Sequence, residues 1–451
     1  MLFTKILDYK EDIIKDINTL LRIKSVSADG AKEPEAALNW ILKRAQSLGL
    51  ETKNINNIAG HVQIGSGEKL TAVLTHLDVV PAGDGWTVPP FELTEKDGRL
   101  FGRGIADDKA AAVVALYCLK VIKESGEPIN NRLRVIFGTS EEIGMSDMEE
   151  YFAAEELPDL SFTPDSEYGI CNCEKGILQV RLSGSNNGTT LSKFRAGTAV
   201  NTVPDKAFVL LDCSENDDHQ LLRLADAKEG KYKFSYTIDG VLIESKGKSA
   251  HAMEPEKGFN AITHLVDLLT SNFGHDVLGN VCSFIDSHIG IETNGNSLGL
   301  KMRDSESGEL TVNLGTVDIS ESEANCTLDI RYPVTMNFQS IIDRITSAAK
   351  LEDLKLNILS HLPPLNVKEN SPVVSILSDA YEAVTGEKPT VYSTGGGTYA
   401  RTLGGKGVAF GPVFNGDICN LHQADESINK ENLFLHAQIC LEAMRLLATN
   451  N

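Results

Sequence analysis

The stretch LTAVLTHLD, residues 70–78, joins a compact apolar run to a histidine and an aspartate. Short apolar runs bounded by charge are typical of strands buried in a parallel sheet. A second such run, RLRVIFGT at residues 132–139, lies downstream, and residues 107–124 between the two runs have a helical pattern. The order strand, helix, strand predicts an α/β fold with its site at the carboxyl ends of the strands.

The end of the chain again has the pattern of alternating strands and helices. Two prolines at 363–364 indicate a break between elements, and the apolar spacing beyond them is typical of helices. The elements expected there are a helix at 373–385, a strand at 407–410 and a closing helix at 429–448. With two helices expected in the first fifty residues, these elements predict one α/β domain built from both ends of the chain.

The middle of the chain has a different pattern. Short strand-like runs occur at 178–182, 208–213 and 310–315, with a helix expected at 259–269. This pattern predicts an α+β domain. We therefore expect one domain of residues 1–173 and 364–451, interrupted by an inserted domain of residues 174–363.

Composition excludes several classes of partner. The 451 residues include 63 acidic and 42 basic side chains, a formal charge of −21, which disfavours binding to nucleic acid or to an anionic membrane. The longest apolar run, residues 110–119, is well short of the roughly 18 residues of a membrane span. The first residues lack the pattern of a signal peptide, so we expect a cytoplasmic protein.

Histidines and carboxylates recur where the predicted strands end. They are His76 and Asp78 after the first strand, Asp107–Asp108 before the helix, Glu141–Glu142 after the second strand, Asp165 after another apolar run, and His422 late in the chain. Each motif alone has an ordinary explanation, such as a hydrogen-bonded loop histidine, a helix N-cap or a solvated acidic loop. Together, imidazole and carboxylate donors suit Zn²⁺ or Mn²⁺.

The charge of these donors favours two metal ions over one. If one aspartate bridges, then Asp107, Glu142 and Asp165 contribute three negative charges, and a bridging hydroxide contributes a fourth. Two divalent cations balance this sum, whereas one ion leaves the site anionic. Glu141, beside the ligand Glu142, is then free to act as a base on a metal-bound water.

The order of these motifs, with S-A-H at residues 249–251, resembles the M20-type co-catalytic metallopeptidases, which include dipeptidases, carboxypeptidases and aminoacylases. Residues 76–86, HLDVVPAGDGW, resemble the branch of Xaa-Xaa dipeptidases in particular. The resemblance covers nearly the whole chain. It implies a zinc-exopeptidase-like catalytic domain, with a mixed, mostly parallel sheet and helices on both faces. It also implies an inserted α+β lid of two fold units.

The resemblance assigns the metal ligands. It implies that His76, Asp107 and Asp165 hold one ion. Glu142, Asp107 and His422 would hold the other, with Asp107 as the bridge.

The resemblance also implies roles for other side chains. Asp78 would orient the ring of His76. Glu141 would be the general base for water attacking the peptide carbonyl, and His251 of the lid would stabilise the oxyanion. Asn201 and Arg331 would contact the substrate, although a turn asparagine and an exposed strand arginine are the ordinary alternatives.

The stretch TGGGTYAR, residues 394–401, predicts an anion site. Gly395, Gly396 and Gly397 precede an expected helix, and exposed backbone N–H groups at a helix N-terminus attract negative charge. The stretch is not a phosphate loop of the G-K-[ST] type. The resemblance implies that this loop receives the C-terminal carboxylate of the substrate.

These inferences lead to one expected activity and several alternatives. We expect metal-dependent hydrolysis of dipeptides with a free amino end, with two divalent ions, Zn²⁺ or Mn²⁺, as cofactors. The alternatives are an aminoacylase or carboxypeptidase acting on N-acyl amino acids, a catalytically silent metal-bound binding protein, and a phosphoester hydrolase. The long lid resembles the doubled form that supplies His251 within one chain, so we expect a monomer.

Overall fold

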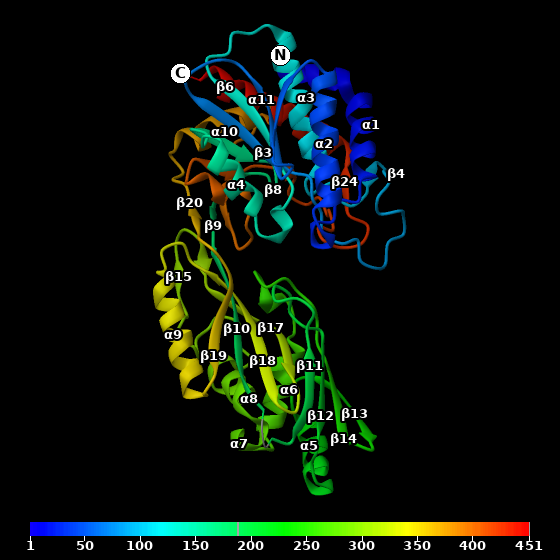
Figure 1. Cartoon of the computed structure of the whole chain (residues 1–451), viewed down its shortest axis with the longest axis vertical. Helices are drawn as coiled ribbons and strands as arrows, with labels where there is room; N and C mark the ends of the chain where they lie inside the picture. The colour runs from blue at the N-terminus through cyan, green and yellow to red at the C-terminus, as the bar shows by residue number, and fades with distance from the viewer. Residues whose placement is uncertain (187–188, 451) are drawn as a thin grey trace. The chain divides into compact units, whose positions relative to one another are not determined.

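The computed structural model describes residues 1–186 and 189–450, and the chain divides into two compact units. The first unit contains Met1–Cys173, Leu365–Tyr392 and Gly397–Asn451, and the second contains Glu174–Pro364 and Ser393–Gly396. The chain therefore begins and ends in the first unit, as the colours of Figure 1 show. Each unit is described by itself below.

The first unit is built on a mixed sheet whose central strands β6, β3, β7 and β22 run parallel. The nine strands of the sheet are β1 (Glu51–Ile55), β2 (Ala59–Ile64), β3 (Leu70–His76), β6 (Arg132–Gly138), β7 (Leu160–Thr163), β9 (Ile170–Glu174), β20 (Leu365–Asn366), β21 (Val391–Thr394) and β22 (Gly407–Ala409). β3 and β6 are the two strands predicted from apolar runs, and the strand expected near residue 407 is β22. The predicted α/β class is confirmed.

Helices cover both faces of this sheet because alternate residues of its strands are apolar on both sides. Val73 of β3 and Val135 of β6 belong to a core that includes α3 (Lys109–Ser125) and α11 (Lys430–Thr449). Leu74 and Ile136, which point the other way, pack in a second core with α4 (Ser146–Ala154). The remaining helices of the unit are α1 (Lys10–Leu21), α2 (Lys32–Ser47) and α10 (Pro372–Thr385).

Helix α3 is buried from Lys109 to Leu119, which fits an apolar run on all sides of a helix. The expected helix started at residue 107, but the observed one starts at Lys109. Asp107 and Asp108 lie outside it, and the peptide bond between them is cis. The two aspartates therefore occupy the segment that leads into the helix.

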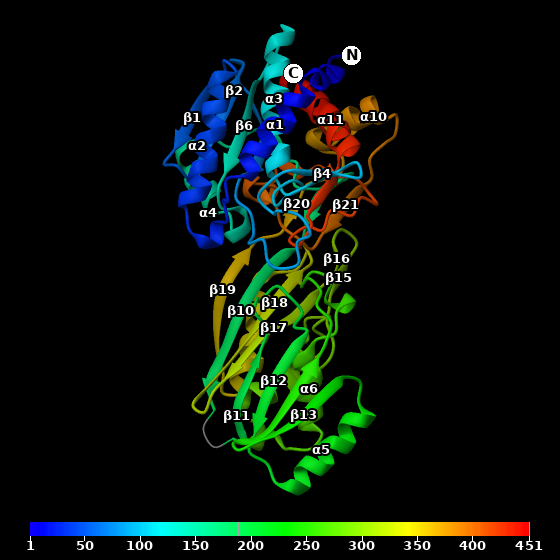
Figure 2. The ribbon, with the colours of Figure 1, turned by 90° about the vertical axis from the view of Figure 1, so that its right-hand side faces the viewer.

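The second unit is an eight-stranded antiparallel sheet with helices. Its strand order is β13-β14-β12-β11-β17-β18-β10-β19, so four strands stand on each side of the β11–β17 junction (Figure 2). The strands are β10 (Gly176–Ser185), β11 (Leu191–Ala196), β12 (Lys206–Leu211), β13 (Lys231–Thr237), β14 (Gly240–Lys246), β17 (Thr311–Ile319), β18 (Glu323–Tyr332) and β19 (Lys355–Leu362). Leu178, Val180 and Leu182 of β10 are fully buried at alternate positions, as one packed sheet face requires.

The remaining helices and strands complete both units. In the second unit the helices are α5 (Glu215–Ala227), α6 (Ala261–Thr270), α7 (His275–Leu278), α8 (Asn280–Phe284) and α9 (Phe338–Leu351), and β15 (Arg303–Asp304) pairs with β16 (Gly308–Glu309). In the first unit β4 (Thr94–Lys96), β5 (Arg99–Phe101) and β24 (Ser427–Asn429) form a small sheet, and β8 (Ser166–Glu167) pairs with β23 (Pro412–Val413). No helix among the described residues is long and apolar enough to span a membrane.

Candidate metal centre

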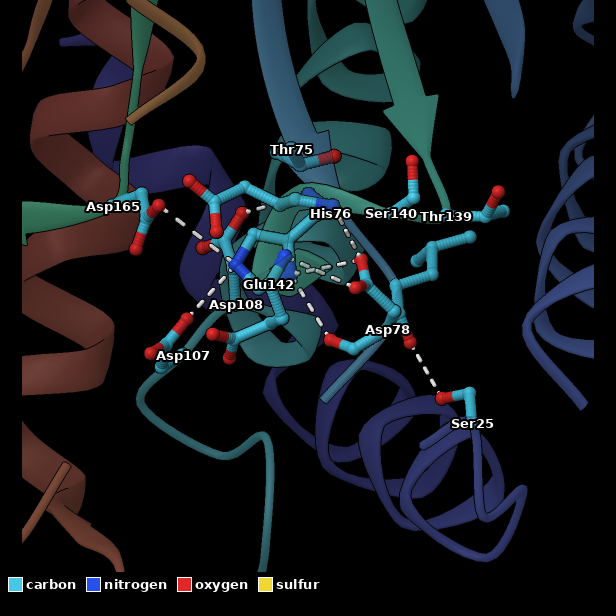
Figure 3. Close-up of polar contacts among 12 residues, drawn as sticks. Ser25, Thr75, His76, Asp78, Asp107, Asp108, Thr139, Ser140, Glu142 and Asp165 are labelled. Atoms are coloured by element: carbon cyan, nitrogen blue, oxygen red, sulfur yellow. Dashed lines mark hydrogen bonds and ion pairs between the residues drawn. The ribbon is translucent and has the colours of Figure 1, made fainter. Parts of the chain in front are cut away.

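The predicted donors of the first unit gather at the carboxyl ends of its parallel strands. His76 is the last residue of β3, Asp165 lies two residues beyond β7, and Glu141–Ile143 form a 3-10 turn shortly after β6. Figure 3 shows His76 between Asp107 and Asp78, with Glu142 and Asp165 nearby. The fold itself therefore brings together residues that are far apart in the sequence.

Asp107 lies between the two histidines. Its Oδ1 is 2.8 Å from Nε2 of His76, and its Oδ2 is 2.9 Å from Nε2 of His422. Each oxygen of one carboxylate thus faces a different imidazole. A carboxylate in this position is available to both histidine-bearing sides of the cluster.

Two further carboxylates extend this pair of imidazoles. Asp165 Oδ2 lies 3.8 Å from His76 Nε2, and Glu142 Oε2 lies 3.3 Å from His422 Nε2. Donor atoms of His76, Asp107 and Glu142 all lie within 4.8 Å of one another. The same holds for His76, Glu141 and Asp165, so the candidate base lies within the cluster of donors.

Asp78 is fully buried and contacts both sides of the cluster. Its Oδ1 lies 3.4 Å from Nδ1 of His76, and its backbone oxygen lies 3.0 Å from the same nitrogen. Its carboxylate also accepts the backbone N–H groups of Glu141, at 3.1 Å, and Glu142, at 3.2 Å. Asp78 therefore orients the ring of His76 and also fixes the backbone that carries the two glutamates.

Asp108 occupies the N-cap position of α3, but its side chain makes no capping hydrogen bond. Its Oδ2 accepts the backbone N–H of His76 at 3.2 Å instead. The helix-cap explanation of the aspartate pair is therefore wrong for Asp108. Its carboxylate supports the end of β3, one residue away from the candidate bridge.

Burial and crowding raise the pKa of several carboxyl groups in the cluster. Burial raises the pKa of Glu141 well above its usual range, and the neighbouring Asp165 raises it further. Burial also raises the pKa of Glu142, with Asp107 adding to the effect. These carboxylates repel one another at close range, which is the condition that bound cations relieve.

The same carboxylates also raise the pKa of the two imidazoles, which favours their charged form. Burial lowers the pKa of His422, but hydrogen bonds with Asp107 and Glu142 outweigh it and raise that pKa to about 11. For His76, burial is likewise outweighed by Asp107 and Asp78, and its pKa lies well above the usual value. The carboxylates of the cluster thus favour the charged form of both rings.

The donor set fits divalent metal ions. It consists of imidazole nitrogens and carboxylate oxygens, which suit Zn²⁺ and Mn²⁺. The Oε1 atom of Glu141 is buried and has no hydrogen-bond partner among the described residues. An orphaned buried carboxylate oxygen is costly in a closed protein interior and is expected where a ligand or reactant binds.

Supporting residues in this region were missed by sequence reasoning. Asp147 accepts the backbone N–H groups of Thr139, at 2.6 Å, and Ser140, at 3.0 Å, and it also accepts the hydroxyl of Tyr399. It thus holds the turn that leads to Glu141. Glu426 accepts the backbone N–H of Asp107 at 3.3 Å and pairs with Arg103. The sequence gives no signal for Asp147, whereas Glu426 stands four residues after His422.

The second unit brings Asn201 and His251 together through their backbones. Thr202 and His251 form an isolated β-bridge, and the N–H of Ala252 donates to the carbonyl of Asn201 at 2.9 Å. Nδ1 of His251 accepts the N–H of Met253 at 3.1 Å. In a neutral ring this hydrogen bond places the proton on Nε2, which becomes a hydrogen-bond donor.

Arg331 is 4% exposed, so the ordinary interpretation as an exposed strand arginine is wrong. Its guanidinium pairs with Asp329, at 2.5 Å from Nε and 3.0 Å from Nη2. Its Nη1 donates to the carbonyl of Gly395 at 2.9 Å. Arg331 therefore holds the first glycine of the predicted anion loop.

The three glycines of that loop have different local contacts. A Cβ at Gly395 would lie 2.8 Å from Cβ of Met253, and a Cβ at Gly397 would lie 2.6 Å from the Arg401 guanidinium. The N–H of Gly396 donates to Thr394 Oγ1. The element after the loop is the five-residue 3-10 turn Tyr399–Leu403, not the expected helix, so a helix dipole contributes little.

An α/β sheet that delivers imidazoles and a shared aspartate to the carboxyl ends of its parallel strands is the framework of a metal-dependent hydrolase. The chain belongs to the peptidase family M20/M25/M40, which residues 72–446 match. The family resemblance and the enzyme class predicted from sequence are confirmed.

Curated relatives align over almost the full chain. The protein described as "Putative dipeptidase YtjP" of Bacillus subtilis (strain 168) is 35% identical over 459 residues, which cover 97% of this chain and 98% of that protein. A "Putative dipeptidase" of Staphylococcus epidermidis is 32% identical over 466 residues, 99% of each chain. Among solved structures, the dipeptidase Dug1p of Saccharomyces cerevisiae is similar in fold, with a TM-score of 0.65, 14% identity, and coverage of 99% of this chain and 98% of that one.

Proposed function

We propose that this protein is a metal-dependent dipeptidase that hydrolyses dipeptides with a free amino end. The observation that carries the proposal is the position of Asp107 between His76 and His422, beside the buried Glu141. The relatives named as dipeptidases support the substrate class. The first unit is then the catalytic domain and the second unit the lid.

Seven residues would bind the metal ions, orient a ligand or transfer protons at the centre. His76, Asp107 and Asp165 would hold one ion, and Glu142, Asp107 and His422 the other, while Asp78 orients His76 and Glu141 remains for proton transfer. When bound, two divalent ions, Zn²⁺ or Mn²⁺, supply Lewis acidity that polarises the scissile carbonyl and makes water easier to deprotonate.

Glu141 would act first as a base and then as an acid in the reaction. It accepts a proton from the water whose oxygen bonds to the carbonyl carbon of the peptide. It then returns that proton to the leaving nitrogen as the C–N bond breaks, so that one amino acid leaves with a carboxylate and the other with an amine. The unpaired Oε1 atom is consistent with this role because no described side chain competes for it.

The second unit would supply the substrate contacts. His251, with its proton on Nε2, would donate to the oxyanion, and Asn201 is tied to it by the local backbone pairing. Arg331 would act through the glycine loop that it holds, where Gly395, Gly396 and Gly397 receive the carboxyl end of the substrate. Since one chain carries every one of these groups, we propose a monomer as the working unit.

The deciding experiment assays dipeptides, their N-acetylated counterparts and a tripeptide with the same purified protein. Each substrate is tested before chelation, after chelation and after addition of Zn²⁺ or Mn²⁺. We expect hydrolysis of free dipeptides only, loss of activity on chelation, and recovery with metal.

Each other outcome identifies a different function. Preference for N-acetylated substrates would indicate an aminoacylase or carboxypeptidase. Metal binding without hydrolysis of any substrate would indicate a binding protein, and activity that survives complete chelation would exclude the proposed metal chemistry.

Replacing His251 by alanine is expected to lower kcat about 10²- to 10³-fold, because one donor to the oxyanion is removed. The metal content is expected to stay unchanged, since His251 lies outside the donor cluster. Steady-state kinetics and metal analysis of the purified variant provide the check. His251→Gln, which keeps an N–H donor, is expected to recover part of the rate.

His219→Ala provides a matched control for the loss of an imidazole. His219 is an exposed residue of α5 in the same unit, with a side chain 65% exposed. Its replacement is expected to leave kcat unchanged. A normal kcat in His251→Ala would remove His251 from the mechanism.

A further inference from the structure

Glu426 and Arg103 form a buried ion pair in the first unit, outside the donor cluster. Arg103 Nη1 lies 2.6 Å from Glu426 Oε2, and each side chain is only 1% exposed. Burying two charges carries a desolvation penalty that their mutual attraction offsets only when the geometry is good. Such a pair is therefore weak evidence for stability, and its contacts indicate another role.

Glu426 binds the backbone that delivers Asp107. Its carboxylate accepts the N–H groups of Gly104 at 3.1 Å, Ala106 at 2.9 Å and Asp107 at 3.3 Å. Glu426 also stands four residues after His422 in the chain. One short segment therefore carries an imidazole of the cluster and at the same time binds the backbone of the candidate bridge.

Arg103 extends the connection to a third segment. Its Nη2 donates to the carbonyls of Pro81 and Ala82, both at 3.3 Å, and of Gln423 at 3.2 Å. Pro81 and Ala82 follow the segment that starts with His76, and Gln423 is next to His422. The guanidinium also lies over the ring of Trp86, 5.3 Å from its centre. The direction of its planar donors is thus fixed on several sides.

We propose that Glu426 and Arg103 are positioning residues for the metal centre. They hold the segments of His76, Asp107 and His422 in one arrangement, so that the donors are placed before metal binds. The benefit is preorganisation: a donor set already in place loses less conformational entropy when the ions bind. This inference rests on the proposed metal-dependent function.

The test is metal affinity, measured by titrating the metal-free protein with Mn²⁺ and with Zn²⁺ in a calorimeter. Glu426→Gln keeps the size of the side chain but presents an NH₂ group to donors that need an acceptor. We expect it to weaken metal binding about 10- to 100-fold, the range seen when supporting partners of metal ligands are removed. Circular dichroism and thermal unfolding without metal show whether the variant is folded.

Glu155→Gln is the matched control. Glu155 lies 3.0 Å from Arg134 Nη1 in a pair whose side chains are 9% and 5% exposed, in the same unit. It is bound by Arg134 and Lys53, and neither of these belongs to the donor segments. We expect this variant to lower thermal stability without changing metal affinity, which separates loss of a buried ion pair from loss of positioning.

Arg103→Lys decides the question if Glu426→Gln does not fold. Lysine keeps the charge beside Glu426 but loses the planar donors that reach Pro81, Ala82 and Gln423. We expect a weakening of metal binding in the same direction and smaller in size. A folded Glu426→Gln, or failing that a folded Arg103→Lys, that binds both metals with the affinity of the unaltered protein would overturn the proposal.

Measurements on the unaltered protein distinguish failure of the proposed function from failure of the proposed positioning role. Its own metal binding tests the proposed function. The ratio between its affinity and that of each variant tests the positioning role.

Discussion

Replacing Glu141 by glutamine is expected to lower kcat about 10²- to 10⁴-fold, the usual contribution of a general base. Glutamine has nearly the same shape as glutamate, so the buried position is kept while the ability to accept and return a proton is lost. The backbone N–H of Glu141 still donates to Asp78, so the neighbouring ligands keep their places. Metal content is therefore expected to match that of the unaltered protein, and kinetics with elemental analysis provide the check.

Two neighbouring variants sharpen this test. Glu142→Gln alters a carboxylate that lies 3.3 Å from His422 Nε2 and is expected to weaken metal binding as well as turnover. Glu149→Gln changes an exposed glutamate of α4 and is expected to change neither. Normal turnover in Glu141→Gln would place the base elsewhere, and loss of metal from it would make Glu141 a ligand.

Replacing Asp107 by asparagine is expected to abolish the centre as a two-metal site. Within the part of the chain that the structure describes, Asp107 is the residue whose two oxygens face both imidazoles, at 2.8 Å and 2.9 Å. Asparagine removes the negative charge and leaves a single acceptor oxygen, so His76 and His422 lose their common partner. We expect metal affinity to fall by more than the roughly 100-fold that loss of a supporting partner causes, and activity to fall with it.

Asp108→Asn is the control for this substitution. Asp108 is adjacent and fully buried, but it accepts the backbone N–H of His76, a contact that the amide oxygen of asparagine retains. Because this contact is kept, metal affinity is expected to fall far less than in Asp107→Asn. If Asp107→Asn binds two ions per chain as tightly as the unaltered protein, Asp107 is not the bridge.

Local patterns were sufficient for much of the fold. The apolar runs at β3 and β6 predicted buried strands because a strand covered on both faces needs apolar residues at successive positions. The same reasoning predicted α3 and α11, whose apolar character is continuous or periodic over several turns. The predicted start of α3, residue 107, is two residues before the observed start at Lys109. Aspartate is favoured at helix starts, so the pattern places the aspartate pair in the helix.

The tripeptide Asp107–Asp108–Lys109 shows the limit of such patterns. No local pattern distinguishes the two adjacent carboxylates; the family resemblance selects Asp107, and the folded chain shows what each carboxylate contacts. Asp107 meets His422, which lies 315 positions away, whereas Asp108 meets the backbone of His76. Arg331 is a similar case, since its guanidinium donates to the carbonyl of Gly395, 64 positions away, as well as to the nearby Asp329.

The sequence by itself determined the α/β class, the peptidase family and the chemical types of the donors, because hydrophobic periodicity and residue type are local properties. The tertiary structure decided how Asp107 reaches both histidines, that Asp78 also binds the backbone of the two glutamates, and that Glu426 and Arg103 connect three segments. Those pairings join residues up to 323 positions apart. They depend on how buried surfaces pack and on which polar groups must be satisfied there, and no local pattern encodes either.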